Sequence, residues 1–220
     1  MNETTETSAR IISPQRRKLI HFGMIAGAMG AVSVVAGSPS KVLARQTRNP
    51  KADIELINGA IALEQRAVNT YQAAAKNNLL PTKAYLDVAL EFASDHTHHR
   101  DLLKKAVIEV FQAKPADVSN VGTFPIPQKV LHGSEADVLR YALTLEMLAS
   151  KAYFNYIRDQ LTTTEAVNIA ANIMPVENQH VAVYRTVLLV VLNDRGLSGD
   201  TQLVPYPFFS QQPTPPVPVA

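Results

Sequence analysis

Apolar residues recur every three or four positions through four long stretches of the chain, which is the spacing of one buried face of an α-helix. The stretches cover residues 52–77, 83–113, 135–160 and 165–194. In the first stretch, for example, Ile57, Ile61 and Val68 share a face. The pattern predicts four helices and an all-α fold.

Short connections join these helices in pairs. Asn78 to Thr82 separates the first two and Leu161 to Thr164 the last two, so each pair is expected to form an antiparallel hairpin. The longer segment from Lys114 to Gly133 can span roughly 66–72 Å when extended. It therefore permits the second and third helices to run parallel, as in a four-helix bundle of two hairpins joined by a long crossover.

The two hairpins repeat one another. With an offset of 82 residues, Glu64 falls on Glu146, Tyr71 on Tyr153, Asp95 on Glu177 and His98 on His180. Apolar positions follow the same register, which indicates a duplicated helical hairpin.

Acidic residues interrupt the apolar faces of these helices. Glu64 lies between Ile61 and Val68, and Glu146 lies between Leu143 and Tyr153. Because an isolated buried carboxylate costs several kcal/mol, such residues need a partner inside the bundle. A network with arginines such as Arg66 or Arg140 is one explanation, and bound metal ions are another.

The second helix of each hairpin carries an acid-x-x-His pair, whose members lie on one helix face within a single turn. Two divalent cations would offset four carboxylates, while the histidines bind as neutral ligands. The sequence thus predicts a site for two metal ions. Its expected ligands are Glu64, Asp95, His98, Glu146, Glu177 and His180.

With these six residues in this order, the chain resembles the ferritin-like superfamily over about 145 of its 220 residues. The resemblance implies a ferritin-like four-helix bundle that holds two Fe or Mn ions and reacts with dioxygen or peroxide. It implies terminal ligands at Glu64 and Glu146, bridging ligands at Asp95 and Glu177, and nitrogen ligands at His98 and His180. Asp95 departs from the usual glutamate, and its shorter side chain puts bridging in question.

His96 and His99 are expected to lie in solvent, because the register with His180 selects His98, and no role is expected for His132 beside the crossover. Three tyrosines lie one or two turns beyond expected ligands: Tyr71, Tyr153 and Tyr184. Tyr71 and Tyr153 are interpreted either as core aromatics with a hydroxyl partner, or as donors to groups that hold the ligands, or as radical relays. Tyr184, one turn past His180, is the nearer candidate for supporting a ligand.

Pro175 stands two residues before Glu177 within the expected fourth helix. It is expected to kink or bulge that helix, which would either re-aim Glu177 or bend the bundle.

The first 44 residues resemble a twin-arginine export signal, with Arg16 and Arg17 before an apolar stretch and a cleavage site after Ala44. A membrane anchor is the alternative, although the apolar run is shorter than the roughly 20 residues that span a bilayer. We therefore expect an exported protein, periplasmic or extracellular, that uses the twin-arginine machinery and has no membrane contact after signal removal.

The composition of the chain bears on which kinds of site and partner are possible. The chain has no cysteine, which excludes disulfides, zinc-thiolate sites and iron–sulfur clusters. Beyond Ala44 it has 16 basic and 17 acidic residues, so nothing favours nucleic acid as a partner. The expected organisation is a linker at 45–51, the bundle at 52–196 and a proline-rich tail at 197–220.

Two function classes are compatible with these residues. The first is a di-iron or di-manganese redox protein, and the second is a non-catalytic metal-binding or stress-related structural bundle. An adhesion or scaffold module that uses the tail is a third possibility, and its binding would not depend on Glu64 or Glu146.

Overall fold

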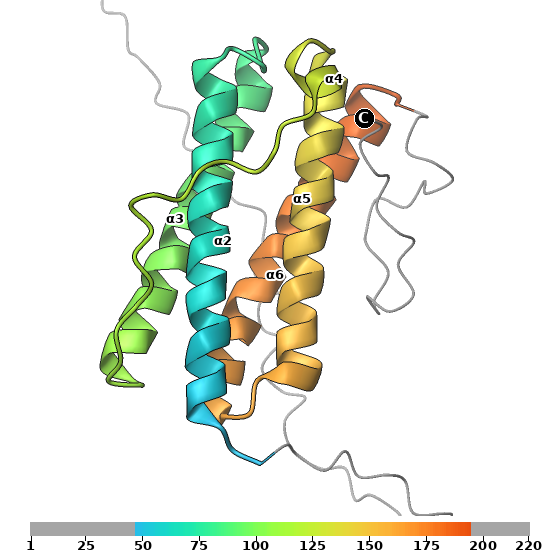
Figure 1. Ribbon diagram of the computed structural model, residues 1–220. Coiled ribbons are helices and arrows are strands. Elements are labelled where there is room, and N and C mark those ends of the chain that lie inside the picture. The colour runs from blue at the N-terminus through green and yellow to red at the C-terminus, as the bar shows by residue number, and fades with distance from the viewer. Residues whose placement is uncertain (1–46, 195–220) are drawn as a thin grey trace, which may run out of the picture. The chain divides into compact units, whose positions relative to one another are not determined.

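The computed structural model describes residues 47–194, and these form a pair of antiparallel helical hairpins (Figure 1). The elements are α2 (Pro50–Lys76), α3 (Lys83–Glu109), α4 (Gln128–Leu131), α5 (Glu135–Asn155), the π-helical turn η1 (Tyr156–Gln160), α6 (Thr164–Thr186) and the π-helical turn η2 (Val187–Val191). The predictions for the export signal, Arg16, Arg17, cleavage after Ala44 and the tail lie outside the described residues.

The predicted topology is confirmed. α2 packs against α3 and α5 against α6, while α3 also contacts α6. The segment between α3 and α5 crosses over α2 from one end of the bundle to the other, so α3 and α5 run parallel (Figure 1). Hydrogen bonds hold the crossover there: Ala116 N–H donates to Asn58 Oδ1 (2.7 Å) and Phe124 N–H to Thr70 Oγ1 (2.9 Å).

Local chemistry sets the helix ends. Asn49 caps α2 by accepting from Ala52 N–H (3.2 Å), and Ser134 forms a reciprocal capping box with Asp137 at the start of α5. α3 ends at Glu109, four residues before the predicted end, and Gln112 then adopts a left-handed φ of 50°.

The start of α6 is fixed from across the bundle. Asp53 of α2 is fully buried and accepts from the backbone N–H groups of Thr162 (2.9 Å) and Thr163 (2.8 Å) and from both threonine hydroxyls. α6 then continues through Pro175 without ending. The effect of this proline on Glu177 remains a prediction.

Two apolar clusters fill the interior, one toward each end of the bundle. One contains Phe92, Leu139 and Leu188, and the other contains Ile57, Leu103 and Ile173. On α3, His96 and His99 lie between members of the two clusters, and on α6 Glu177 and His180 do. This arrangement encloses a polar layer halfway along the helices.

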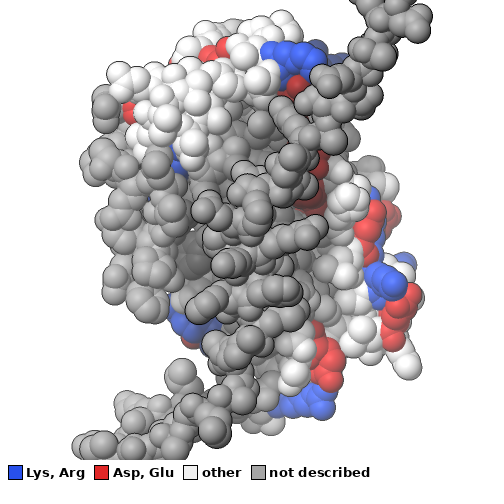
Figure 2. Space-filling view, turned by 180° about the vertical axis from the view of Figure 1, so that it is seen from behind, with Lys and Arg blue, Asp and Glu red and all other residues white. Residues whose placement is uncertain are grey.

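On the surface of the bundle, acidic and basic side chains lie next to one another on the described part of the rear face (Figure 2). On α3, Lys83 pairs with Asp87 and Lys105 with Glu109. Among the described residues, no helix combines the length and apolar character needed to cross a bilayer.

Candidate metal centre

Six metal-ligand-type side chains meet in the polar layer, and each is at most 7% exposed. α2 supplies Glu64, α3 supplies His96 and His99, α5 supplies Glu146, and α6 supplies Glu177 and His180. Four of them were predicted from sequence: Glu64, Glu146, Glu177 and His180.

The six residues form two overlapping groups of four, within each of which one ligand atom per residue lies within 4.8 Å of the others. Glu64, His96, His99 and Glu177 make the first group, and His96, Glu146, Glu177 and His180 make the second. Each group offers two carboxylates and two imidazoles, and His96 and Glu177 belong to both.

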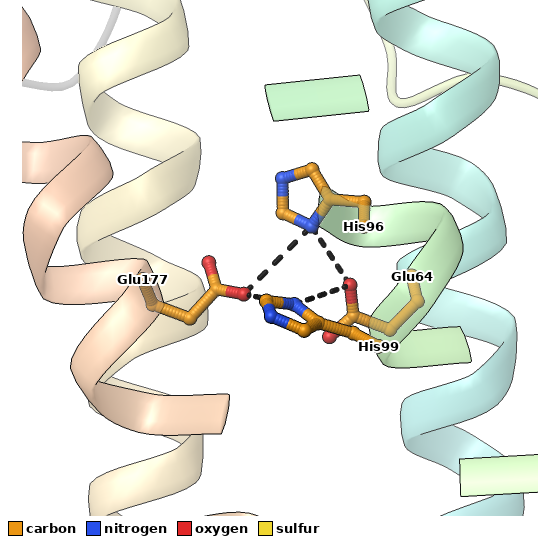
Figure 3. A group of neighbouring side chains, drawn as sticks. All are labelled: Glu64, His96, His99 and Glu177. Carbon is orange, nitrogen blue, oxygen red and sulfur yellow. Dashed lines mark hydrogen bonds and ion pairs between the residues drawn. The ribbon is translucent and has the colours of Figure 1, made fainter. Parts of the chain in front are cut away.

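In the first group, the side chains of α2, α3 and α6 converge on one point (Figure 3). His96 Nδ1 lies 2.7 Å from Glu64 Oε2 and 3.8 Å from Glu177 Oε1. His99 Nδ1 lies 2.8 Å from Glu177 Oε1 and 3.7 Å from Glu64 Oε2. All four contacts therefore pair an imidazole nitrogen with a carboxylate oxygen.

The second group is built around Glu146. His180 Nδ1 lies 3.0 Å from Glu146 Oε2, and His96 Nε2 lies 3.3 Å from Glu146 Oε1. The two ring nitrogens of His96 thus face carboxylates of different hairpins. His180 Nε2 lies 3.1 Å from Asp95 Oδ2, a partner that would hold the Nε2–H tautomer and leave Nδ1 toward the centre.

Glu177 is the most unusual of these residues. Its side chain is fully buried, yet neither carboxylate oxygen has a hydrogen-bond partner in the described part of the chain. The nearby His99 Nδ1 also lacks one, although it lies 2.8 Å away, because the contact does not have hydrogen-bond geometry. Buried polar atoms without hydrogen-bond partners are rare, and here they lie close together. A cation bound between them would satisfy these atoms better than their contacts with one another do.

Without a cation, protons balance the charge. Burial lowers the pKa of His96, but the carboxylates of Glu146 and Glu64 outweigh it and the pKa lies well above the ordinary value. Burial also lowers the pKa of His99, but the carboxylates of Glu177 and Glu64 outweigh it and raise the pKa to about 9. Burial raises the pKa of Glu177 to about 7. At Glu64 the histidines overcome burial and lower the pKa to about 2.

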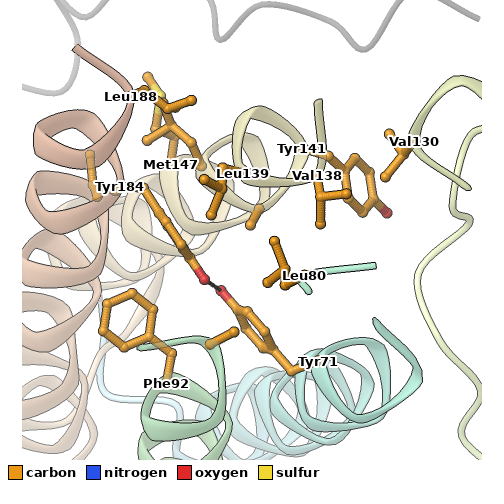
Figure 4. Packing of buried hydrophobic residues seen from close by; sticks show 14 of the residues in the cluster. Tyr71, Leu80, Phe92, Val130, Val138, Leu139, Tyr141, Met147, Tyr184 and Leu188 are labelled. Carbon is orange, nitrogen blue, oxygen red and sulfur yellow. Dashed lines mark hydrogen bonds between the residues drawn. The ribbon is translucent and has the colours of Figure 1, made fainter. Parts of the chain in front are cut away.

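Tyrosines support the two glutamates reciprocally across the bundle. Tyr153 of α5 donates to Glu64 of α2 (2.5 Å), and Tyr71 of α2 donates to Glu146 of α5. Burial and the neighbouring carboxylate raise the pKa of both hydroxyls well above its ordinary value, so both stay protonated. Tyr184 donates to the Tyr71 hydroxyl (3.1 Å) within the apolar cluster of Figure 4, rather than to a ligand.

The sequence register was wrong on α3. His98 is exposed and lies in neither group, Asp95 is partly exposed at the edge, and His96 and His99, expected in solvent, are buried. The first hairpin is one residue longer between its glutamate and its pair, so His96 and His99, not Asp95 and His98, occupy the positions of Glu177 and His180.

The missed histidines could have been found from the apolar pattern of their own helix. Phe92, His96, His99 and Leu103 have the four-three-four spacing of a buried stripe, and all four are buried. On α6 the same spacing joins Ile173, Glu177, His180 and Tyr184.

The alternative partners named from sequence lie elsewhere. Arg140 pairs with Asp194 (2.6 Å) and Asp137 (2.9 Å), and the Arg66 guanidinium lies 5.6 Å from the centroid of the Phe124 ring. The contacts of these arginines therefore give no support to an arginine network around the buried acids.

Comparison with known proteins gives one result. A family model described as a ferritin-like domain matches residues 52–189, a range that includes all six buried residues. No curated protein and no solved structure matches the chain.

Proposed function

The chain belongs to the ferritin-like domain family, and from this premise we propose that it binds two divalent metal ions, Fe or Mn, and reacts with dioxygen or peroxide. The observation that carries the proposal is Glu177, a fully buried carboxylate without a hydrogen-bond partner among the described residues, shared by two groups of four ligands. Neighbouring imidazoles and carboxylates form a ligand set that suits iron and manganese.

Each residue has a role in this proposal. Glu64 and His99 would hold one ion, and Glu146 and His180 the other, while His96 and Glu177 face both groups. When bound, iron or manganese would supply redox chemistry toward dioxygen or peroxide.

The surrounding hydroxyls and carboxylate would keep the ligands in place. Tyr71 and Tyr153 hold their protons toward Glu146 and Glu64 and fix the orientation of these carboxylates. Asp95 orients His180 through its Nε2. The apolar clusters on either side of the polar layer would keep bulk water from reaching the centre through the two ends of the bundle.

Metal content tests the site directly. After anaerobic reconstitution with Fe²⁺ or Mn²⁺, elemental analysis is expected to find about two ions per chain in the wild type and fewer than one in Glu177→Gln. Glu91→Gln is the matched control, because Glu91 is exposed on α3 outside both groups. Equal metal content in wild type and Glu177→Gln would refute the assignment.

Reactivity separates the redox protein from the non-catalytic alternative. The Fe²⁺-loaded wild type is expected to oxidise its iron on mixing with dioxygen or peroxide faster than the buffer does. Stoichiometric loading with oxidation at the buffer rate would leave a metal-binding or structural bundle.

Export is proposed on the sequence of residues 1–44, where Arg16 and Arg17 precede the apolar stretch. Expression of the full chain is expected to yield an exported protein whose N-terminus, by mass spectrometry, follows Ala44. Retention of the Arg16→Lys/Arg17→Lys variant in the cytoplasm would agree with the twin-arginine route, and unchanged export of that variant would contradict it.

A further inference from the structure

A cavity of about 310 Å³ lies between α2 and α5. Its wall is almost entirely apolar, and small residues of the two helices, Ala67 and Ala149 among them, leave the space. Leu63 and Leu148, which also line it, are 43% and 50% exposed. The cavity is therefore reachable from the surface.

The crossover forms part of the same wall through Phe124 and Ile126. Polar atoms next to this part of the crossover are hydrogen-bonded within the protein. Thr70 Oγ1 accepts from Phe124 N–H (2.9 Å), and the Tyr141 hydroxyl donates to Pro125 O (2.7 Å). These hydrogen bonds fix the wall and leave few polar groups to receive a hydrophilic ligand.

Part of the cavity wall belongs to the metal centre. Glu64, Glu146 and His96 line it, together with Tyr71 and Tyr153, which donate to the two glutamates. A molecule in the cavity would thus have apolar contacts along α2 and α5 and would meet the centre on the side of these glutamates.

We propose that this cavity binds a small apolar molecule, a hydrocarbon or aromatic compound, next to the metal centre. A cavity of about 150 Å³ lined by aliphatic and aromatic side chains is large enough for benzene, so twice that volume suits a bicyclic ring or a chain of comparable size. The binding rests on the cavity alone, and the position of the ligand next to a metal ion rests on the proposed function.

Naphthalene is a suitable probe, and its fluorescence can be titrated with the metal-free full chain. Ala149→Phe and, independently, Ala67→Phe place a ring in the cavity and are expected to weaken binding at least tenfold. Ala171→Phe is the matched control, because Ala171 is exposed on α6 and does not line the cavity. Absence of binding to the wild type, or equal affinity in correctly folded Ala149→Phe and Ala67→Phe variants, would overturn the proposal.

A second measurement places the ligand relative to the centre. Mn²⁺ loading is expected to broaden the proton NMR lines of bound naphthalene, and binding without broadening in the loaded protein would overturn the connection between cavity and centre. If elemental analysis finds no Mn²⁺ after loading, the proposed function fails, whereas the fluorescence titration still decides whether the cavity binds apolar molecules.

Discussion

The metal-free protein is expected to lose stability as the pH rises from 5 to 9. The cause lies at Glu177 and His99, whose Oε1 and Nδ1 atoms are 2.8 Å apart in the buried layer. Each holds a proton more tightly in the folded chain than in the unfolded chain. Raising the pH removes these protons and leaves the buried carboxylates with fewer positive charges to balance them.

The size of the effect follows from the two pKa values. Burial raises the pKa of Glu177 from 4.5 to about 7, so stability falls between these values by about 3 kcal/mol. For His99, the pKa rises from 6.5 to about 9, and stability that is fully present below 6.5 is lost as the pH passes 9, again about 3 kcal/mol. Because the residues are in contact, they titrate as a pair, and the combined loss is about 3–6 kcal/mol.

Thermal unfolding of the chelator-treated full chain, followed by circular dichroism, measures this loss. At roughly 2–4 °C per kcal/mol, the midpoint at pH 9 should lie at least about 6 °C below that at pH 5. The double variant His99→Gln/Glu177→Gln removes both groups and should show a smaller fall. A midpoint that stays constant or rises toward pH 9, or an equal fall in the double variant, would refute the reasoning.

Three further outcomes are expected. Metal loading at pH 7 should release at least two protons per chain, from His96 and His99, and part of a third from Glu177, whose pKa is about 7, as measured with an indicator dye in weak buffer. Asp95→Asn should lower metal affinity by about 10–100-fold through His180, whereas His98→Gln, exposed on the same helix, should leave it unchanged in a competition titration. Asp53→Ala should destabilise the metal-free chain by about 2–4 kcal/mol in denaturant unfolding, because two buried backbone N–H groups lose their acceptor.

The fold was predictable because local signals agree with the global arrangement. Helical periodicity marked the helices, and two short connections left only antiparallel hairpins. The pattern did not reveal the short helix α4 (Gln128–Leu131) or the early end of α3 at Glu109. Both depend on contacts and turns of the crossover, which the periodicity of the helices does not encode.

The residues of the centre could be predicted only where an acidic residue occupies a position that the apolar pattern places in the interior. Glu64, Glu146 and Glu177 are acids at apolar positions, and His180 follows Glu177 by one turn. On α3 the repeat and the buried stripe defined by Phe92 and Leu103 point to different histidines, because a connection can gain one residue without disturbing either helix. A one-residue shift turns a helical position by about 100°, enough to exchange a buried side chain for an exposed one.

The duplication is therefore symmetric at the glutamates and tyrosines but broken at one ligand. Where α6 has Glu177, α3 has His96, so the six residues carry three carboxylates instead of the four expected from sequence. Two divalent ions bound to neutral imidazoles would then leave one positive charge in a buried layer, a charge that the four-carboxylate set would not leave. That excess favours an anionic group near the ions, and the carboxylate of Asp95, whose Oδ2 lies 3.1 Å from His180 Nε2, is placed to supply it.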